Sequence, residues 1–151
     1  MYTDGSKSEL GVGSGVAIFT GKELVTQIKY KLDNGCSNNQ AEQLAIAKAV
    51  EAIETINIEE NKPRTAEIIT DIRIALDSIK NLNNHSYLIE EIRKRLSKLE
   101  RSNWKVTFSW VKAHAGILGN ELADQLAKAA VGAKDKTVTY SRIPTSTLYR
   151  E

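Results

Sequence analysis

The sequence has a single cysteine, no long apolar run, no internal repeat and no low-complexity segment. With Cys36 alone, an internal disulfide is excluded, which favours a reducing, intracellular compartment without distinguishing nucleus from cytoplasm. No apolar stretch approaches the roughly 20 residues that a membrane-spanning helix needs. The chain opens on a strand-like stretch rather than on a secretory signal. We therefore expect no membrane partner.

Length and composition indicate one globular domain. A chain of 151 residues buries roughly two thirds of the surface that it exposes when unfolded. Its 41% hydrophobic and 26% charged residues are ordinary values for a globular protein. We expect one core and, for the isolated domain, a monomer. The net charge of +2 is too small to indicate a nucleic-acid partner by itself.

Basic residues gather in one segment of the chain. Between residues 90 and 112, seven lysines and arginines stand against three glutamates. Two interpretations are open: this is the solvated face of an amphipathic helix, or it is a surface that holds nucleic-acid phosphates. The basic residues are Arg93, Lys94, Arg95, Lys98, Arg101, Lys105 and Lys112.

An antiparallel meander of three strands is predicted for the start of the chain. The first strand runs directly into Asp4. The glycine-rich stretch 11–15 is expected to form a flexible turn before a strand at 16–19. Clean alternation of apolar and polar residues over 24–32 predicts the third strand.

A helix is predicted next, from Ser37 to about Ile56. Ser37 and Gln40 have the spacing of a capping box. Glu42 heads an apolar stripe at helical spacing, so its carboxylate should be buried and should need a cation or a metal ion as a partner. The stripe continues through Ile46, Ala49, Ile53 and Ile56.

The remaining elements alternate between strands and helices, which places neighbouring strand ends side by side in one sheet. A polar end with no regular structure is expected from Gly132 onward. The predicted elements are a strand at 66–70 ending at Asp71, helices at 73–81 and 87–101, a strand at 104–110 and a helix at 120–131.

Four carboxylates fall at strand ends or on inward helix faces: Asp4, Glu42, Asp71 and Asp124. Each alone has a local explanation, such as capping a turn or facing a helix dipole, but four together favour one site. Converging carboxylates repel each other unless a divalent cation neutralises them, and oxygen ligands select Mg²⁺ or Mn²⁺. His114 lies on a turn between small residues. We expect Asp77 and His85 to face solvent and Cys36 to be a loop thiol.

Five motifs, in order along the chain, resemble those of the ribonuclease H family. They are Thr3-Asp4-Gly5-Ser6, Asn38-Asn39-Gln40-Ala41-Glu42, Thr70-Asp71, Trp110-Val111-Lys112-Ala113-His114-Ala115-Gly116 and Asn120-Glu121-Leu122-Ala123-Asp124. The resemblance spans residues 1–132 and leaves 133–151 as a tail or linker. It implies an α/β fold with a five-stranded mixed sheet, strands 1 to 3 antiparallel and strands 4 and 5 parallel, with helices on both faces.

The resemblance also implies an activity, which is hydrolysis of the RNA strand of RNA/DNA hybrids by two Mg²⁺ ions, with Mn²⁺ as a substitute. The implied metal ligands are Asp4, Glu42, Asp71 and Asp124, and His114 would assist proton transfer or product release. The implied substrate contacts are Gly5, Ser6, Asn38, Asn39, Gln40, Arg73 and Asn120. Contact with the RNA 2′-hydroxyl would distinguish RNA from DNA, and Arg73 and the basic helix would hold DNA phosphates.

The stretch from His114 to Glu121 is similar to ribonuclease H domains of non-LTR retrotransposon polyproteins, which implies a neighbouring reverse transcriptase. Two departures affect substrate contacts: Ile72 and Ile74 replace the serine and the aromatic residue common in the family. The basic insertion of bacterial forms is also missing.

Two alternative functions are open. The first is an inactive module for nucleic-acid binding or docking, and the presence of all four acidic residues argues against it. The second is a transposase or integrase, which would not be expected to carry both the Asn38 motif and His114.

Overall fold

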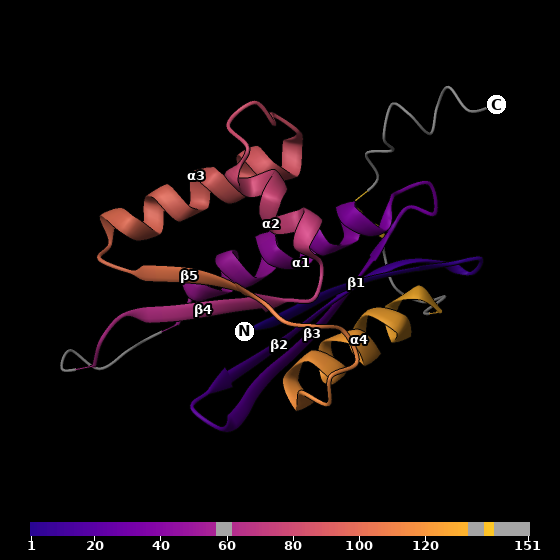
Figure 1. Ribbon diagram of the computed structural model, residues 1–151, viewed down its shortest axis with the longest axis horizontal. Coiled ribbons are helices and arrows are strands. Elements are labelled where there is room, and N and C mark those ends of the chain that lie inside the picture. Colours follow the sequence, from indigo (N-terminus) through magenta and orange to yellow (C-terminus); the bar gives the residue numbers. More distant parts are fainter. Residues whose placement is uncertain (57–61, 133–137, 141–151) are drawn as a thin grey trace.

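The computed structural model describes residues 1–56, 62–132 and 138–140, which form one sheet covered by helices on both faces (Figure 1). The strands are β1 (Tyr2–Ser8), β2 (Gly11–Thr20), β3 (Glu23–Leu32), β4 (Thr65–Thr70), β5 (Lys105–Trp110) and β6 (Val138–Tyr140). The helices are α1 (Asn38–Ile53), α2 (Arg73–Lys80), α3 (Tyr87–Arg101) and α4 (Leu118–Val131).

The sheet has the strand order β5-β4-β1-β2-β3-β6. Strands β1, β2 and β3 form an antiparallel meander, and β4 pairs in parallel with both β1 and β5. This confirms the fold class predicted from the sequence. The short strand β6 is an addition, because it pairs in parallel with β3 where the sequence indicated an irregular end.

The sequence predicted a turn for the glycine-rich stretch 11–15, and this prediction was wrong. These residues form the first half of β2. Its glycines leave room for α4, whose main chain lies directly on the strand. A Cβ atom on Gly13 would lie 2.4 Å from the carbonyl oxygen of Ala127, and one on Gly15 would lie 2.3 Å from that of Ala123. These glycines therefore mark a close approach of two backbones, a role that glycine takes inside strands.

Replacing Gly15 with alanine should lower the free energy of unfolding by about 1 to 3 kcal/mol, because the new methyl group overpacks the contact with α4. Urea denaturation measures the change. Gly132→Ala is the matched control, since among the described residues no atom beyond its chain neighbours and its own helix backbone lies within 4 Å of a Cβ built there. Equal stability of the Gly15 variant and the wild-type protein would contradict a tight α4 contact.

Helices α1, α2 and α3 lie on one face of the sheet and α4 on the other (Figure 1). The predicted capping box at the start of α1 is present: the Ser37 hydroxyl accepts from the Gln40 N–H, and the Gln40 side chain accepts from the Ser37 N–H. Helix α1 also packs closely on β1, because a Cβ on Gly5 would lie 2.6 Å from the Glu42 nitrogen. Both helices are thus fixed against the central strands.

The interior divides into two apolar clusters. The larger one joins α1 and α3 to the sheet and includes Ile46, Ile53, Ile68 and Ile92. The smaller one contains Cys36, which is a loop residue as predicted but has a fully buried side chain. Burial raises the pKa of the Cys36 thiol, so this group is a poor nucleophile.

Candidate active site

The candidate site begins where β1 and β4 separate. Their parallel pairing ends at Thr3 and Thr70, while β1 continues alongside β2 to Ser8. Asp4 follows Thr3 directly, and Asp71 follows Thr70. The separation of two parallel strands therefore brings two carboxylates to the same opening in the sheet.

Asp4 is the centre of the cluster, with only 4% of its surface exposed. It lies on the α4 face of the sheet, because its cross-strand partner Gly15 lies against Ala123. Its own Oδ1 accepts a hydrogen bond of 2.9 Å from the Gly5 N–H. Burial raises the pKa of Asp4 to about 9, and three nearby carboxylates add to the increase: Glu42, Asp71 and Asp124.

Glu42 approaches from the opposite face of the sheet on α1 and is fully buried. Burial raises its pKa to about 8, and the charge of Asp71 adds to the increase, while the hydroxyl groups of Thr3 and Thr70 act in the other direction. Its Oε1 accepts a short hydrogen bond from the Thr3 hydroxyl. Its Oε2 is buried and has no hydrogen-bond partner in the described part of the chain.

Asp124 reaches the cluster from α4 and forms an ion pair with Lys128, one helical turn later, at 2.9 Å between Oδ2 and Nζ. The hydrogen bond with Asp124 and the charge of that group raise the pKa of Lys128. Sequence reasoning missed Lys128, although its spacing of four residues from Asp124 is the spacing of helical ion pairs. The Lys128 side chain is 61% exposed, so it is free to leave when another cation takes its place.

Asp71 is held through its main chain. Trp110 ends β5 opposite Thr70 and donates a hydrogen bond of 3.1 Å from its indole N–H to the carbonyl oxygen of Asp71. Arg73 begins α2 and stacks on the same indole, with its Cζ 4.3 Å from the ring centre. Sequence reasoning placed Trp110 in a motif but gave it no role in the site.

The donor set fits a divalent metal ion. All four side chains offer carboxylate oxygens, the ligands that Mg²⁺ and Mn²⁺ prefer. The buried Oε2 of Glu42 has no donor among the residues that the structure describes. Among the described residues, no three such side chains already stand close enough to surround an ion.

The other predicted site residues lie at the rim of this cluster or beside it. Gly5 is buried under α1, and Ser6 is half-buried on β1. His114 is exposed in the loop between β5 and α4, with a left-handed backbone at φ 55°. Three amides begin α1, namely Asn38, Asn39 and Gln40, the last of which is engaged in the capping box. The Oδ1 atoms of Asn39 and of Asn120, on α4, are buried without a partner among the described residues.

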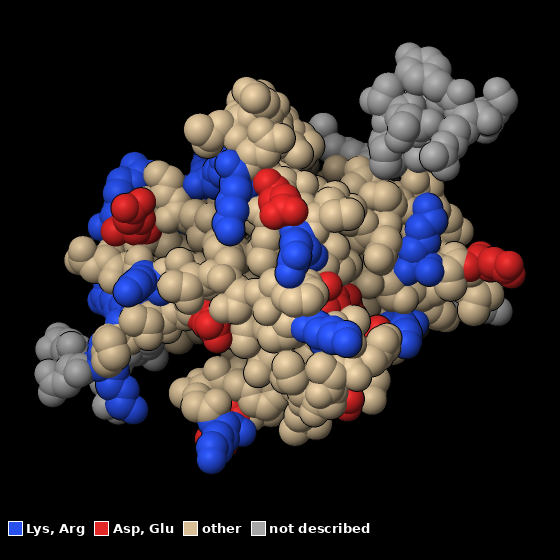
Figure 2. Space-filling model, in the orientation of Figure 1, with Lys and Arg blue, Asp and Glu red and all other residues tan. Residues whose placement is uncertain are grey.

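Three of the seven basic residues in the segment 90–112 form ion pairs within the part of the protein that the structure describes. Arg95 pairs with Glu91 and Glu54, and Lys98 also pairs with Glu54. Arg93 donates to main-chain carbonyl groups in the last turn of α2 and just after it, on Ser78, Ile79, Asn81 and Asn84. Figure 2 accordingly shows acidic and basic side chains interspersed rather than one continuous basic stripe. This favours the solvated-helix interpretation for Arg93, Arg95 and Lys98.

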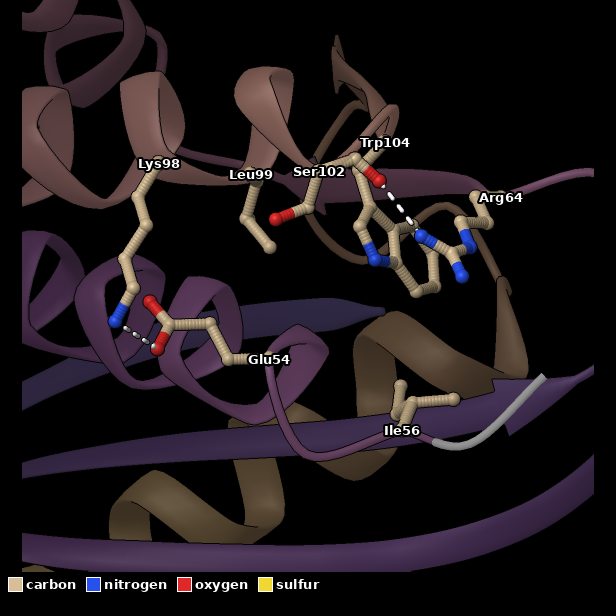
Figure 3. A pocket seen from close by; sticks show the side chains of 7 residues that line it. All are labelled: Glu54, Ile56, Arg64, Lys98, Leu99, Ser102 and Trp104. Carbon is tan, nitrogen blue, oxygen red and sulfur yellow. Dashed lines mark hydrogen bonds and ion pairs between the residues drawn. The ribbon is translucent and has the colours of Figure 1, made fainter.

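A separate cavity of about 350 Å³ lies at the other end of β4 and β5, where α1 ends and β4 and β5 begin (Figure 3). Its charged side chains are also satisfied: Lys98 pairs with Glu54 at 3.5 Å, and Arg64 donates to the Ser102 carbonyl oxygen at 2.8 Å. The residues lining this cavity are Glu54, Ile56, Arg64, Lys98, Leu99, Ser102 and Trp104.

The fold and the carboxylate cluster define an α/β protein whose site opens at the ends of its central strands. Comparison with known proteins identifies the family, because the RNase H family model matches residues 1–132. The chain is 31% identical to a ribonuclease H of Jannaschia sp., over 86% of this chain and 88% of the relative. It is 30% identical to one of Pseudoalteromonas translucida, over 89% and 90%. The chain belongs to the ribonuclease H family and is a ribonuclease H enzyme.

A solved structure agrees with the fold. The crystal structure of RNase H1 from the halophilic archaeon Halobacterium salinarum matches with a TM-score of 0.65 at 21% identity, over 86% of this chain and 94% of the other. Within the described residues, every helix is too short or too polar to cross a membrane.

Proposed function

We propose that this ribonuclease H hydrolyses the RNA strand of RNA/DNA hybrids with two divalent metal ions, Mg²⁺ or Mn²⁺. The observation that carries the proposal is the convergence of four carboxylates on the gap between β1 and β4, one of them with an unpaired buried oxygen. These residues would hold the ions: Asp4, Glu42, Asp71 and Asp124. When bound, the ions would activate water and stabilise the leaving 3′ oxygen.

The protein's own groups would arrange the substrate around this cluster. The side chains at the start of α1 and Asn120 would contact the shallow minor groove, where the RNA 2′-hydroxyl distinguishes RNA from DNA. Gly5 and Ser6 would face the RNA strand at the cluster. His114, exposed on its loop, would move a proton or assist product release. Arg73 would bind a phosphate.

Incubation with labelled substrates tests the proposal. The purified protein is mixed with an RNA/DNA hybrid, single-stranded RNA or double-stranded DNA of one sequence, with Mg²⁺ or with chelator. We expect cleavage of the RNA in the hybrid alone, and only with metal. Equal cleavage of all three substrates would reject hybrid specificity, and hybrid binding without cleavage in Mg²⁺ or Mn²⁺ would favour an inactive binding module.

We also propose that the domain acts in a retroelement polyprotein during reverse transcription. The similarity of the His114–Glu121 stretch to such domains supports this context. Sequencing the transcript on both sides of the region that encodes residues 1–151 tests it. A reading frame that continues into a reverse transcriptase would support the proposal, and a start codon and a stop codon directly flanking the region would contradict it.

A further inference from the structure

Arg73 differs from Arg93 and Arg95 in the partners that its guanidinium contacts. Arg93 and Arg95 are engaged by carbonyl groups or carboxylates. In residues 1–56, 62–132 and 138–140, Arg73 has no ion pair or hydrogen bond, although Asp71 lies two residues earlier. Its guanidinium is exposed, and one face rests on the Trp110 ring. A planar guanidinium stacked in this way keeps its N–H donors available for an anion.

Trp110 is exposed in an unusual way for a large aromatic residue. It is 42% exposed at the end of β5, yet its orientation is fixed on two sides. The indole N–H is bonded to the Asp71 carbonyl oxygen, and the ring face carries Arg73. Because Thr70 pairs with Trp110, the ring lies beside the turn that carries Asp71. The indole thus connects the turn that carries Asp71 to the Arg73 guanidinium, which it holds by a cation–π stack.

We propose that Trp110 is a positioning residue for substrate binding. Its indole, anchored on the Asp71 carbonyl, holds the Arg73 guanidinium beside the carboxylate cluster and away from the carboxylates themselves. There the guanidinium binds a backbone phosphate of the nucleic acid. The proposal rests on the proposed function for the identity of the ligand, and it assigns Trp110 an indirect role, through Arg73, without contact to the reacting atoms.

Equilibrium binding in chelator tests the proposal independently of cleavage. The affinity of a labelled RNA/DNA hybrid is measured by fluorescence anisotropy over a range of salt concentrations. We expect Arg73→Gln and Trp110→Leu each to weaken binding about threefold to tenfold. Each variant should also reduce the slope of log Kd against log salt by about one, the loss of one phosphate contact.

The double variant distinguishes positioning from direct contact. If Trp110 acts through Arg73, the variant with both changes should bind about as weakly as Arg73→Gln alone. A product of the two separate losses would overturn the proposal, since Trp110 would then contact the nucleic acid itself. Trp110→Phe keeps a ring face but loses the N–H anchor, so its loss of affinity should be smaller than that of Trp110→Leu.

Matched controls come from the far end of the same strands. Trp104→Phe and Arg64→Gln change a tryptophan and an exposed arginine in the separate cavity (Figure 3), and both should leave Kd and the salt slope unchanged. In the Trp104→Phe protein, Trp110 is the one remaining tryptophan of the two in the chain. Its emission should change when hybrid binds, and Arg73→Gln should reduce that change, a readout that holds even if Trp110→Leu folds poorly.

The outcomes separate this proposal from the proposed function. Wild-type affinity and salt slope in Trp110→Leu would overturn the positioning role whether or not the enzyme cleaves hybrids. Failure of the wild-type protein to cleave a hybrid with Mg²⁺ would overturn the proposed function, while the binding series would still decide the role of Trp110. If the wild-type protein does not bind the hybrid, the positioning role falls as well.

Discussion

Replacing Asp4 with asparagine is expected to reduce metal-dependent cleavage of hybrid RNA by about 10³-fold or more. Asp4 is the carboxylate that the other three surround, so its loss removes the shared ligand of the proposed metal centre. A loss of about 4 kcal/mol of transition-state stabilisation corresponds to this factor. Single-turnover cleavage of a labelled hybrid at saturating Mg²⁺ measures it.

The fold should survive this change, because asparagine keeps the shape of aspartate and relieves the repulsion within the cluster. Circular dichroism and thermal unfolding of the Asp4→Asn protein check this point. Asp77→Asn is the matched control, since Asp77 is an exposed aspartate on α2, outside the cluster. Cleavage by Asp4→Asn at the wild-type rate would remove Asp4 from the metal site.

The metal-free protein is expected to lose stability as the pH rises from about 5 to 9. Glu42 and Asp4 have pKa values raised from 4.5 to about 8 and from 3.8 to about 9. Between these values the folded state holds protons that the unfolded chain has released, so the free energy of unfolding falls with pH. A loss of only about 2 kcal/mol would lower Tm by roughly 4 to 8 °C. Thermal unfolding in chelator at several pH values measures the slope.

Two changes should flatten this slope. Saturating Mg²⁺ binds the deprotonated carboxylates and should therefore raise Tm more at pH 8 than at pH 5. Glu42→Gln removes one of the two groups and should raise the metal-free Tm at pH 8. Glu100→Gln, which changes an exposed glutamate on α3, is the control and should follow the wild-type curve. A Tm independent of pH in chelator would show that the cluster does not hold these protons.

Features with a local cause were readable from the sequence. The capping box at Ser37 and Gln40 begins α1 as predicted, and the periodic stretch 87–101 is helix α3 over the same residues. The burial of Glu42 followed from its place on an apolar stripe. Each of these depends on neighbours within a few residues, where spacing alone determines which side chains share a face.

Features that depend on distant partners were not readable. The glycines at 11–15 indicate a turn when only the local sequence is considered. Their place in a strand is explained by the close packing of α4 on β2, which leaves no room for larger side chains. From the sequence, the basic residues at 90–112 were candidates for binding phosphate. The sequence does not show which acceptors in the fold engage a lysine or arginine, such as the carbonyl groups that bind Arg93. Strand β6 has only three residues, too few to show an alternation of apolar and polar residues, and it is positioned by pairing with the edge of β3.

Glu54 controls part of the positive charge on the surface of α3. This one carboxylate, at the end of α1, balances both Arg95 and Lys98 on α3. Exchanging it for a neutral residue would leave Lys98 without this partner and Arg95 with Glu91 alone, on a helix that also carries Lys94 and Arg101. The strength with which the protein attracts a polyanion is therefore adjustable through a single codon, at a surface remote from the chemistry and without rebuilding the site.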